Sequence, residues 1–158
     1  PSLAATAMHQ GRLAMAHALG LAVNGEGTRV PFGIYTIPEI SMVGRSEEQL
    51  MADGVPFAAG RAHYREIARG HLVGDHDGLL KILFDPETRK LLGVHALGNG
   101  ATELIHIGQA VIAFGGTIDY FVASVFNYPT FAECYRVAAL DGINRLRAQA
   151  ASPALTQA

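Results

Sequence analysis

The spacing of hydrophobic residues changes near residue 100. Before that point apolar positions recur mainly at every second residue, which predicts strands, and the clearest pair is a hairpin of 79–84 with 91–96 across the turn 85–88. From residue 101 the period is 3.6, which predicts a helix over 101–114 with one apolar face. Strands followed by helices predict an α+β fold with a mostly antiparallel sheet covered by helices.

The remaining elements follow from capping and turn residues. Ser2 can cap a first helix that runs to about Ala18, where Gly20 supplies the stop. The pattern over 65–71 is ambiguous. The other predicted elements are extended segments over 32–43 bent at Pro38, a short helix opened by a Ser46–Gln49 capping box and closed by Gly54, a strand over 57–64, a short helix capped by Thr117, and a long helix over 130–148.

A polar, glycine-containing stretch separates the first helix from the rest of the chain. We therefore expect a first helical unit over 1–23 and a linker over 24–31. A compact domain is expected over 32–150, with a frayed tail over 151–158 that begins near Ser152-Pro153.

Composition excludes several classes of protein. The 158 residues suit one domain with a core, and the net charge of −2, with basic residues scattered singly, argues against nucleic-acid binding. The most apolar stretch, 105–126, is interrupted by polar and glycine residues, so we expect no membrane span, and we see no signal-peptide pattern. The single cysteine, Cys134, excludes an intrachain disulfide and fits a reducing, cytoplasmic setting.

The histidines and the cysteine raise the possibility of a metal site and a reactive thiol, and we expect neither. Among seven histidines, His71 and His76 lie near Asp75 and Asp77, but such a glycine-rich turn is more typical of a solvated loop, and we expect no metal site. Cys134 falls inside the predicted last helix. There a buried, inert thiol is favoured over a nucleophile.

Several stretches together resemble the C-terminal dimerisation domain of the pyridine nucleotide–disulfide oxidoreductase family, and the resemblance covers nearly everything from Pro1 to Arg147. It implies that family's FAD/NAD-linked reductase dimerisation-domain fold and a homodimer, with 1–23 as the C-terminal helix of the FAD domain. The most specific stretches are 33–44, which contains Thr36-Ile37-Pro38-Glu39, then 80–84, 103–110 and 126–130.

The resemblance also implies cofactors. It places Ser2, Leu3 and Ala4 at a helix start that faces the flavin, where free amides favour negative charge. FAD, NAD and NADP are the cofactors that it implies. The FAD-contacting Gly-Asp that directly precedes this helix in the family is absent, since the sequence starts at Pro1, and no Gly-x-Gly-x-x-Gly motif occurs in it. We therefore expect a C-terminal piece of a longer enzyme, inactive by itself.

The segment 126–133 separates branches of the family. Its disulfide reductases read His-Pro-Thr-x-x-Glu there, and that His moves protons for a dithiol. Here Tyr128 stands in place of the His and Glu133 matches the Glu. A tyrosine with a pKa near ~10 is a poor base at neutral pH. The resemblance therefore implies an NAD(P)+ transhydrogenase, which moves a hydride from NADPH through FAD to NAD+.

Alternatives remain open at this point. Tyr128 either reaches the partner subunit's flavin region or fills the space of the absent His with a local hydrogen bond. Glu133 either keeps the family role or, as we favour, forms a Thr-x-x-Glu capping box with Thr130. We assign no catalytic residue. The rival functions are a dihydrolipoamide dehydrogenase-like disulfide reductase and a non-enzymatic interaction module.

Overall fold

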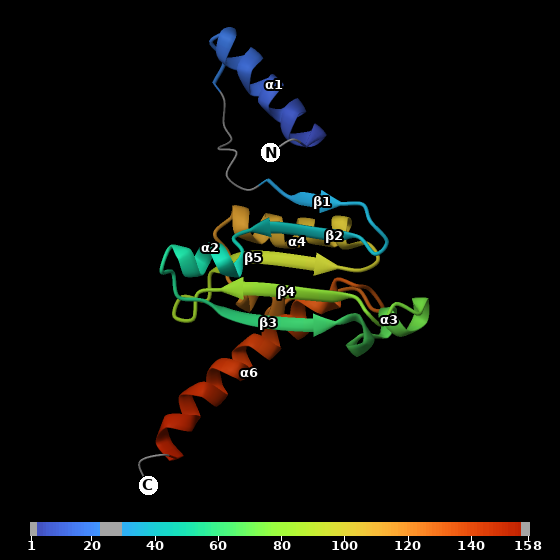
Figure 1. The fold of residues 1–158 in the computed structure, drawn as a ribbon, viewed down its shortest axis with the longest axis vertical. Helices are drawn as coiled ribbons and strands as arrows, with labels where there is room; N and C mark the ends of the chain where they lie inside the picture. The colour runs from blue at the N-terminus through green and yellow to red at the C-terminus, as the bar shows by residue number, and fades with distance from the viewer. Residues whose placement is uncertain (1–2, 23–29, 156–158) are drawn as a thin grey trace.

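The computed structural model describes residues 3–22 and 30–155. Five strands form one antiparallel sheet in the order β1-β2-β5-β4-β3, with helices packed against it, so the predicted α+β class is confirmed (Figure 1). The strands are β1 (Phe32–Ile34), β2 (Ile40–Gly44), β3 (Ala58–His63), β4 (Leu79–Phe84) and β5 (Leu91–Leu97). The helices are α1 (Ala4–Ala18), α2 (Glu47–Ala52), η1 (Tyr64–Glu66), α3 (Ala68–Val73), α4 (Ala101–Ala113), α5 (Asp119–Ala123) and α6 (Glu133–Leu155).

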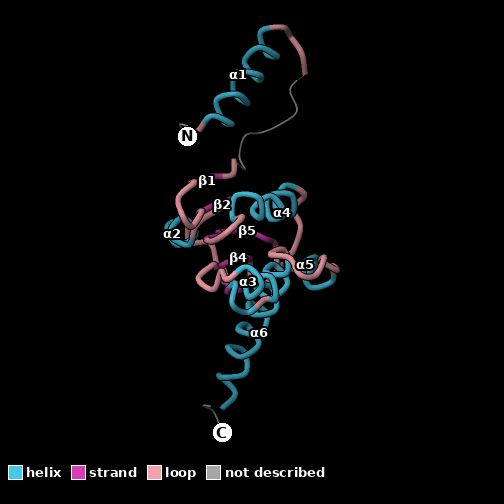
Figure 2. The backbone as a smooth tube through the Cα atoms, turned by 90° about the vertical axis from the view of Figure 1, so that its right-hand side faces the viewer, coloured by secondary structure: helices cyan, strands magenta, loops and turns pink. Residues whose placement is uncertain are grey.

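The two faces of the sheet differ in what covers them. The register aligns Gly60, Ile82 and Val94 on one face, and α4 and α6 pack there, so this face holds the core. Lys81 and His95 are aligned on the opposite face, where α2 lies. Figure 2 shows α2 and α4 on opposite sides of the sheet. The alternation in β4 and β5 thus decides which face receives the long helices.

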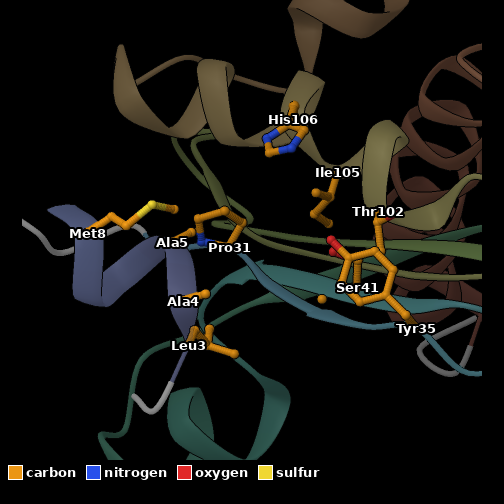
Figure 3. Close-up of a pocket in the computed structure, with 11 residues that line it drawn as sticks. Leu3, Ala4, Ala5, Met8, Pro31, Tyr35, Ser41, Thr102, Ile105 and His106 are labelled. Carbon is orange, nitrogen blue, oxygen red and sulfur yellow. The ribbon is translucent and has the colours of Figure 1, made fainter.

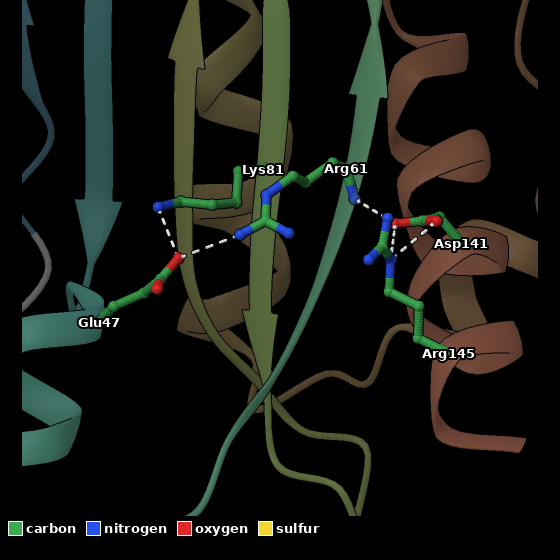
Figure 4. Close-up of polar contacts among 5 residues, drawn as sticks. All are labelled: Glu47, Arg61, Lys81, Asp141 and Arg145. Carbon is green, nitrogen blue, oxygen red and sulfur yellow. Dashed lines mark hydrogen bonds and ion pairs between the residues drawn. The ribbon is translucent and has the colours of Figure 1, made fainter. Parts of the chain in front are cut away.

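Ion pairs tie α2 to the strands, and a hydrogen bond to a carboxylate ties α6 to β3 (Figure 4). Glu47 of α2 accepts a hydrogen bond from Lys81 Nζ at 2.8 Å and lies 3.7 Å from Arg61. These partly exposed pairs contribute about 0–1 kcal/mol each. On α6, Asp141 accepts a hydrogen bond from the backbone N–H of Arg61 at 2.9 Å and also binds Arg145. Because β3 is an edge strand, Asp141 occupies a backbone donor that would otherwise be free to pair with another strand.

Most local signals in the sequence are confirmed. The capping box forms, since Ser46 Oγ accepts from the Gln49 N–H at 3.2 Å and Gln49 Oε1 accepts from the Ser46 N–H at 3.0 Å. In the hairpin turn, Asp85 Oδ1 accepts from the backbone N–H of Thr88 at 2.6 Å. The ambiguous stretch 65–71 folds as η1 and α3.

Three predicted helix boundaries are wrong. Ile118 rather than Thr117 holds the N-cap position of α5. The last helix starts at Glu133, three residues later than predicted, and continues to Leu155. Residues 151–155 are therefore helical where a frayed tail was expected.

Helix α1 lies beyond β1, at one end of the molecule, while α6 points to the opposite end (Figure 1). Leu3 occupies the N-cap position of α1 and makes no side-chain hydrogen bond there. The predicted cap Ser2 and residues 24–29 of the expected linker 24–31 fall outside the described residues.

The close approach of α6 to β3 generates a prediction. A Cβ atom on Gly60 would lie 2.0 Å from the carbonyl oxygen of Ala138, so Gly60→Ala must push the helix away. We expect a loss of about 1–3 kcal/mol in the free energy of unfolding, measured by urea denaturation.

Gly11 of α1 provides the matched control. A Cβ there meets nothing within 4 Å, so Gly11→Ala should be neutral or stabilise by up to about 1 kcal/mol. Equal stability for the two variants would contradict the packing described for α6.

Candidate functional site

Tyr128 lies at the tip of the turn between α5 and α6. Its side chain is 73% exposed, and a cis peptide bond joins it to Pro129. The turn is closed beneath it by the Thr130 hydroxyl, which donates to the carbonyl oxygen of Asn127 at 2.6 Å. The backbone thus presents an aromatic ring and a phenol to the surroundings, and no described residue bonds the Tyr128 hydroxyl.

The capping-box interpretation of Glu133 is wrong. Thr130 Oγ1 is turned to Asn127, and α6 begins only at Glu133, so Thr130 does not occupy a capping position. The Glu133 Oε2 atom is buried and finds no hydrogen-bond partner among the described residues. A buried acceptor without a donor costs about 1–3 kcal/mol, so this carboxylate is poised to accept a further hydrogen bond.

Tyr135 ties the start of α6 to α4. Its buried hydroxyl accepts from the Gly108 N–H at 3.0 Å and donates to the Leu104 carbonyl at 2.9 Å. These two groups would ordinarily bond each other as the i and i−4 partners of a helix turn. Burial raises the pKa of Tyr135, so the bridging hydroxyl stays protonated. The phenol therefore ties one turn of α4 to the start of α6.

Glu39 provides a second tie to α4. Its carboxylate accepts from the backbone N–H of Thr102 at 3.1 Å and from the Thr102 hydroxyl at 2.7 Å. The hydroxyl bond, followed by the backbone bond, lowers the pKa of Glu39. The predicted buried face of α4 is confirmed, but the contacts of Glu39 and Tyr135 were missed. Their only sequence signals are a Pro-Glu pair and an aromatic residue inside a helix.

Leu3 and Ala4 lie at the edge of a cleft of about 400 Å³ beside α1. Figure 3 shows Leu3, Ala4 and Met8 on one side and Tyr35 and other residues of the main body on the opposite side. The start of α1 carries neither a capping side chain nor an acidic residue in its first turn. Among the described residues, the first backbone amides of α1 are therefore left without a side-chain cap.

The structure does not bring all the candidate residues together within one chain. The cleft beside α1 is lined by residues of α1, β2, α4 and the β1 region, and the Tyr128 turn contributes none of them. His71 and His76 do approach each other, with ring centroids 5.4 Å apart. Within 3–22 and 30–155, however, no three His, Cys, Asp or Glu side chains are placed to hold one metal ion. No helix in the same ranges is long and apolar enough to cross a membrane.

The domain is thus an antiparallel sheet with α4 and α6 on one face and an exposed Tyr-Pro turn directly before α6. The family model described as "Pyridine nucleotide-disulphide oxidoreductase, dimerisation domain" matches residues 30–139. The chain belongs to this family, and the predicted dimerisation-domain fold is confirmed.

Within this family, the chain is similar to curated proteins named soluble pyridine nucleotide transhydrogenase. The chain is 53% identical over 148 residues to a soluble pyridine nucleotide transhydrogenase of Mycobacterium bovis, covering 94% of this chain and 32% of the relative. It is 54% identical over 154 residues to the enzyme of the same name from Escherichia coli O1:K1 / APEC, covering 92% and 32%. The chain therefore spans about a third of the length of these relatives.

Solved structures share the fold. LpdA of Mycobacterium tuberculosis superposes with a TM-score of 0.79 at 29% identity, covering 87% of this chain and 30% of LpdA. The HOCl-induced flavoprotein disulfide reductase RclA of Escherichia coli gives a TM-score of 0.75 at 24% identity, covering 82% and 30%. The RclA comparison concerns the fold alone.

The environment of Cys134 generates a prediction. The thiol is buried, as expected, and burial raises its pKa to about 12. At pH 8 only about one molecule in ten thousand would carry the reactive thiolate. A thiol-specific disulfide reagent at pH 8 should leave Cys134 of the folded chain unmodified over minutes and modify one equivalent in denaturant. Equal rates in the two conditions would contradict an inert thiol.

Proposed function

We propose that this chain is the dimerisation part of a flavoprotein NAD(P)+ transhydrogenase. The observation that carries the proposal is the exposed tyrosine at position 128. Among the described residues, none hydrogen-bonds its phenol, and none donates a hydrogen bond to the Glu133 Oε2 atom. Such a pair is poorly suited to moving protons for a dithiol. The identity of 53–54% to soluble pyridine nucleotide transhydrogenases supports the same conclusion.

The bound FAD would supply the redox chemistry, accepting a hydride from NADPH and yielding it to NAD+. The residues of this chain would contact the edge of the flavin ring. We propose that Leu3 and Ala4, together with Ser2, present helix-start amides to the flavin. Their uncapped position and the adjoining cleft support this role. In this proposal 1–23 belongs to an FAD domain and 32–150 forms the dimerisation domain.

A homodimer would complete the site. Within one chain the Tyr128 turn is separate from the cleft at α1, so one copy cannot supply both sides of it. Phe114 and Val125 are large apolar side chains, 91% and 94% exposed, on the segments that flank α5. A two-fold contact through this surface would cover them and bring each Tyr128 towards the flavin of the partner. Such pairing places Tyr128 at a subunit junction.

We further propose a cytoplasmic protein whose other partners are nicotinamide dinucleotides, without nucleic acid or membrane. The single cysteine and the word "soluble" in the names of the relatives support this setting. By itself the chain is expected to bind FAD and nucleotides weakly and to be inactive, since its sequence lacks a Gly-x-Gly-x-x-Gly turn.

A disulfide reductase is the second candidate. The name of RclA favours it, but that likeness is 24% identical and concerns the fold. The tyrosine at position 128 argues against it, because a phenol is a poor base at neutral pH. The transhydrogenase proposal is therefore the better supported of the two.

Substitutions of Tyr128 in the intact protein test the proposal. The wild type should transfer hydride from NADPH to an NAD+ analogue and should not reduce lipoamide or glutathione. Tyr128→Ala should lower the transhydrogenase rate at least about tenfold, equivalent to roughly 1.4 kcal/mol, because a side chain at the flavin junction is lost. Tyr128→His should not create efficient disulfide reduction, since a base without a cysteine pair is insufficient.

The matched control is Met51→Ala on α2, where another large exposed side chain is removed on the opposite face of the sheet, away from the proposed dimer contact. This variant should retain both FAD and activity. Unchanged FAD content and rate in Tyr128→Ala would contradict the placement of Tyr128 at the junction. Disulfide reduction by the wild type would favour the second candidate.

A further inference from the structure

Tyr64 and Phe131 form a stacked pair close to the Tyr128 turn. Their ring centroids are 4.3 Å apart and the ring planes are inclined by 27°. Tyr64 belongs to η1 and is fully buried, whereas Phe131 is half-buried immediately before α6. Only Pro129 and Thr130 separate Phe131 from Tyr128. The stack is thus the nearest aromatic contact to the exposed phenol along the chain.

The Tyr64 ring is held on several sides. A Cβ on Gly78 would approach the ring to 2.1 Å and one on Gly98 to 2.7 Å, so glycine backbone closes around the ring at both places. The hydroxyl donates to the carbonyl oxygen of Asn99 at 3.2 Å. Burial raises the pKa of Tyr64, so this donor keeps its proton. Tyr64 therefore offers Phe131 a fixed surface built from β4, β5 and η1.

Tyr128 lacks support of its own. Its ring is largely exposed, and none of the residues in the described ranges bonds its hydroxyl. Its location is decided by the backbone on either side. On one side Thr130 bonds Asn127, and on the other the Phe131 carbonyl accepts from Cys134 N at 3.0 Å, at the first turn of α6. Phe131 is thus the packed residue that joins the exposed turn to the rigid helix.

We propose that the Tyr64–Phe131 stack positions Tyr128, and that Phe131 and Tyr64 are positioning residues for hydride transfer across the subunit junction. The catalytic meaning of this inference rests on the proposed function. The positional claim stands on the geometry of the stack alone. Small displacements of a group beside a reacting centre lower the rate without weakening substrate binding elsewhere.

A purely structural role is the competing explanation, and two Phe→Leu variants separate it from positioning. Phe131→Leu keeps an apolar side chain and removes the stack. Phe84→Leu is the matched control, because Phe84 is fully buried beneath Gly142 of α6 and away from the turn. Tyr64→Phe keeps the ring and removes only the bond to Asn99.

The first measurement is amide hydrogen exchange of 124–132 in the intact protein, followed by mass spectrometry. Phe131→Leu should accelerate exchange of this segment about tenfold, because the equilibrium constant for its local opening should rise by the same factor. Phe84→Leu should leave it unchanged while lowering the melting temperature. Tyr64→Phe should give a smaller acceleration than Phe131→Leu. Unchanged exchange in Phe131→Leu would overturn the inference.

The second measurement separates kcat from KM. Phe131→Leu should lower kcat for transhydrogenation about tenfold with KM for both nucleotides within about twofold. Phe84→Leu should change neither. Equal losses in the two variants would indicate a general structural effect and overturn the inference. A wild-type protein without transhydrogenase activity would instead contradict the proposed function, and the exchange experiment would still decide the positional claim.

Discussion

The hydroxyl of Tyr135, a residue of α6, bonds two backbone groups within one turn of α4. The Gly108 N–H and the Leu104 carbonyl are buried, and each would be costly to leave without a partner. Gly108 also has no space for a side chain, since a Cβ there would lie 2.6 Å from Val94. The phenol therefore fixes the distance and the register between the two long helices. The positions of the other residues of the proposed site depend on this pair of helices.

The sheet gives the helix pair its platform. Helix α4 rests on β5 and β2, and α6 rests on β3 and β4, so the two helices sit side by side on one face. Gly60 lets α6 approach β3 closely, while Glu39 holds the first turn of α4. Because both helices are fixed near their starts, the turn that enters α6 projects from a rigid base. Tyr128 is exposed for this reason and not because the segment lacks neighbours.

Short-range chemistry made much of the fold predictable. The Ser46–Gln49 box and the turn after Asp85 are local arrangements within four residues, and both form as the sequence indicates. Thr130 and Glu133 show the limit of such reasoning. The same Thr-x-x-Glu spacing is compatible with a cap or with a turn, and the choice depends on where Phe131 packs. Its partner Tyr64 comes from a distant part of the chain, so spacing could not reveal it. The bond of Glu39 to Thr102 is hidden for the same reason.

Only those residues of the candidate site that match a family motif could be predicted from the sequence. The substitution of tyrosine for histidine at position 128 is visible in the sequence, but the buried, unpartnered oxygen of Glu133 is not. The most direct test is a structure of the intact protein with FAD bound. We expect a two-fold dimer in which the Tyr128 hydroxyl of one subunit lies within hydrogen-bond reach of the partner's flavin site, directly or through one water. A Tyr128 that faces bulk solvent in the dimer, or that contacts only its own subunit, would contradict it.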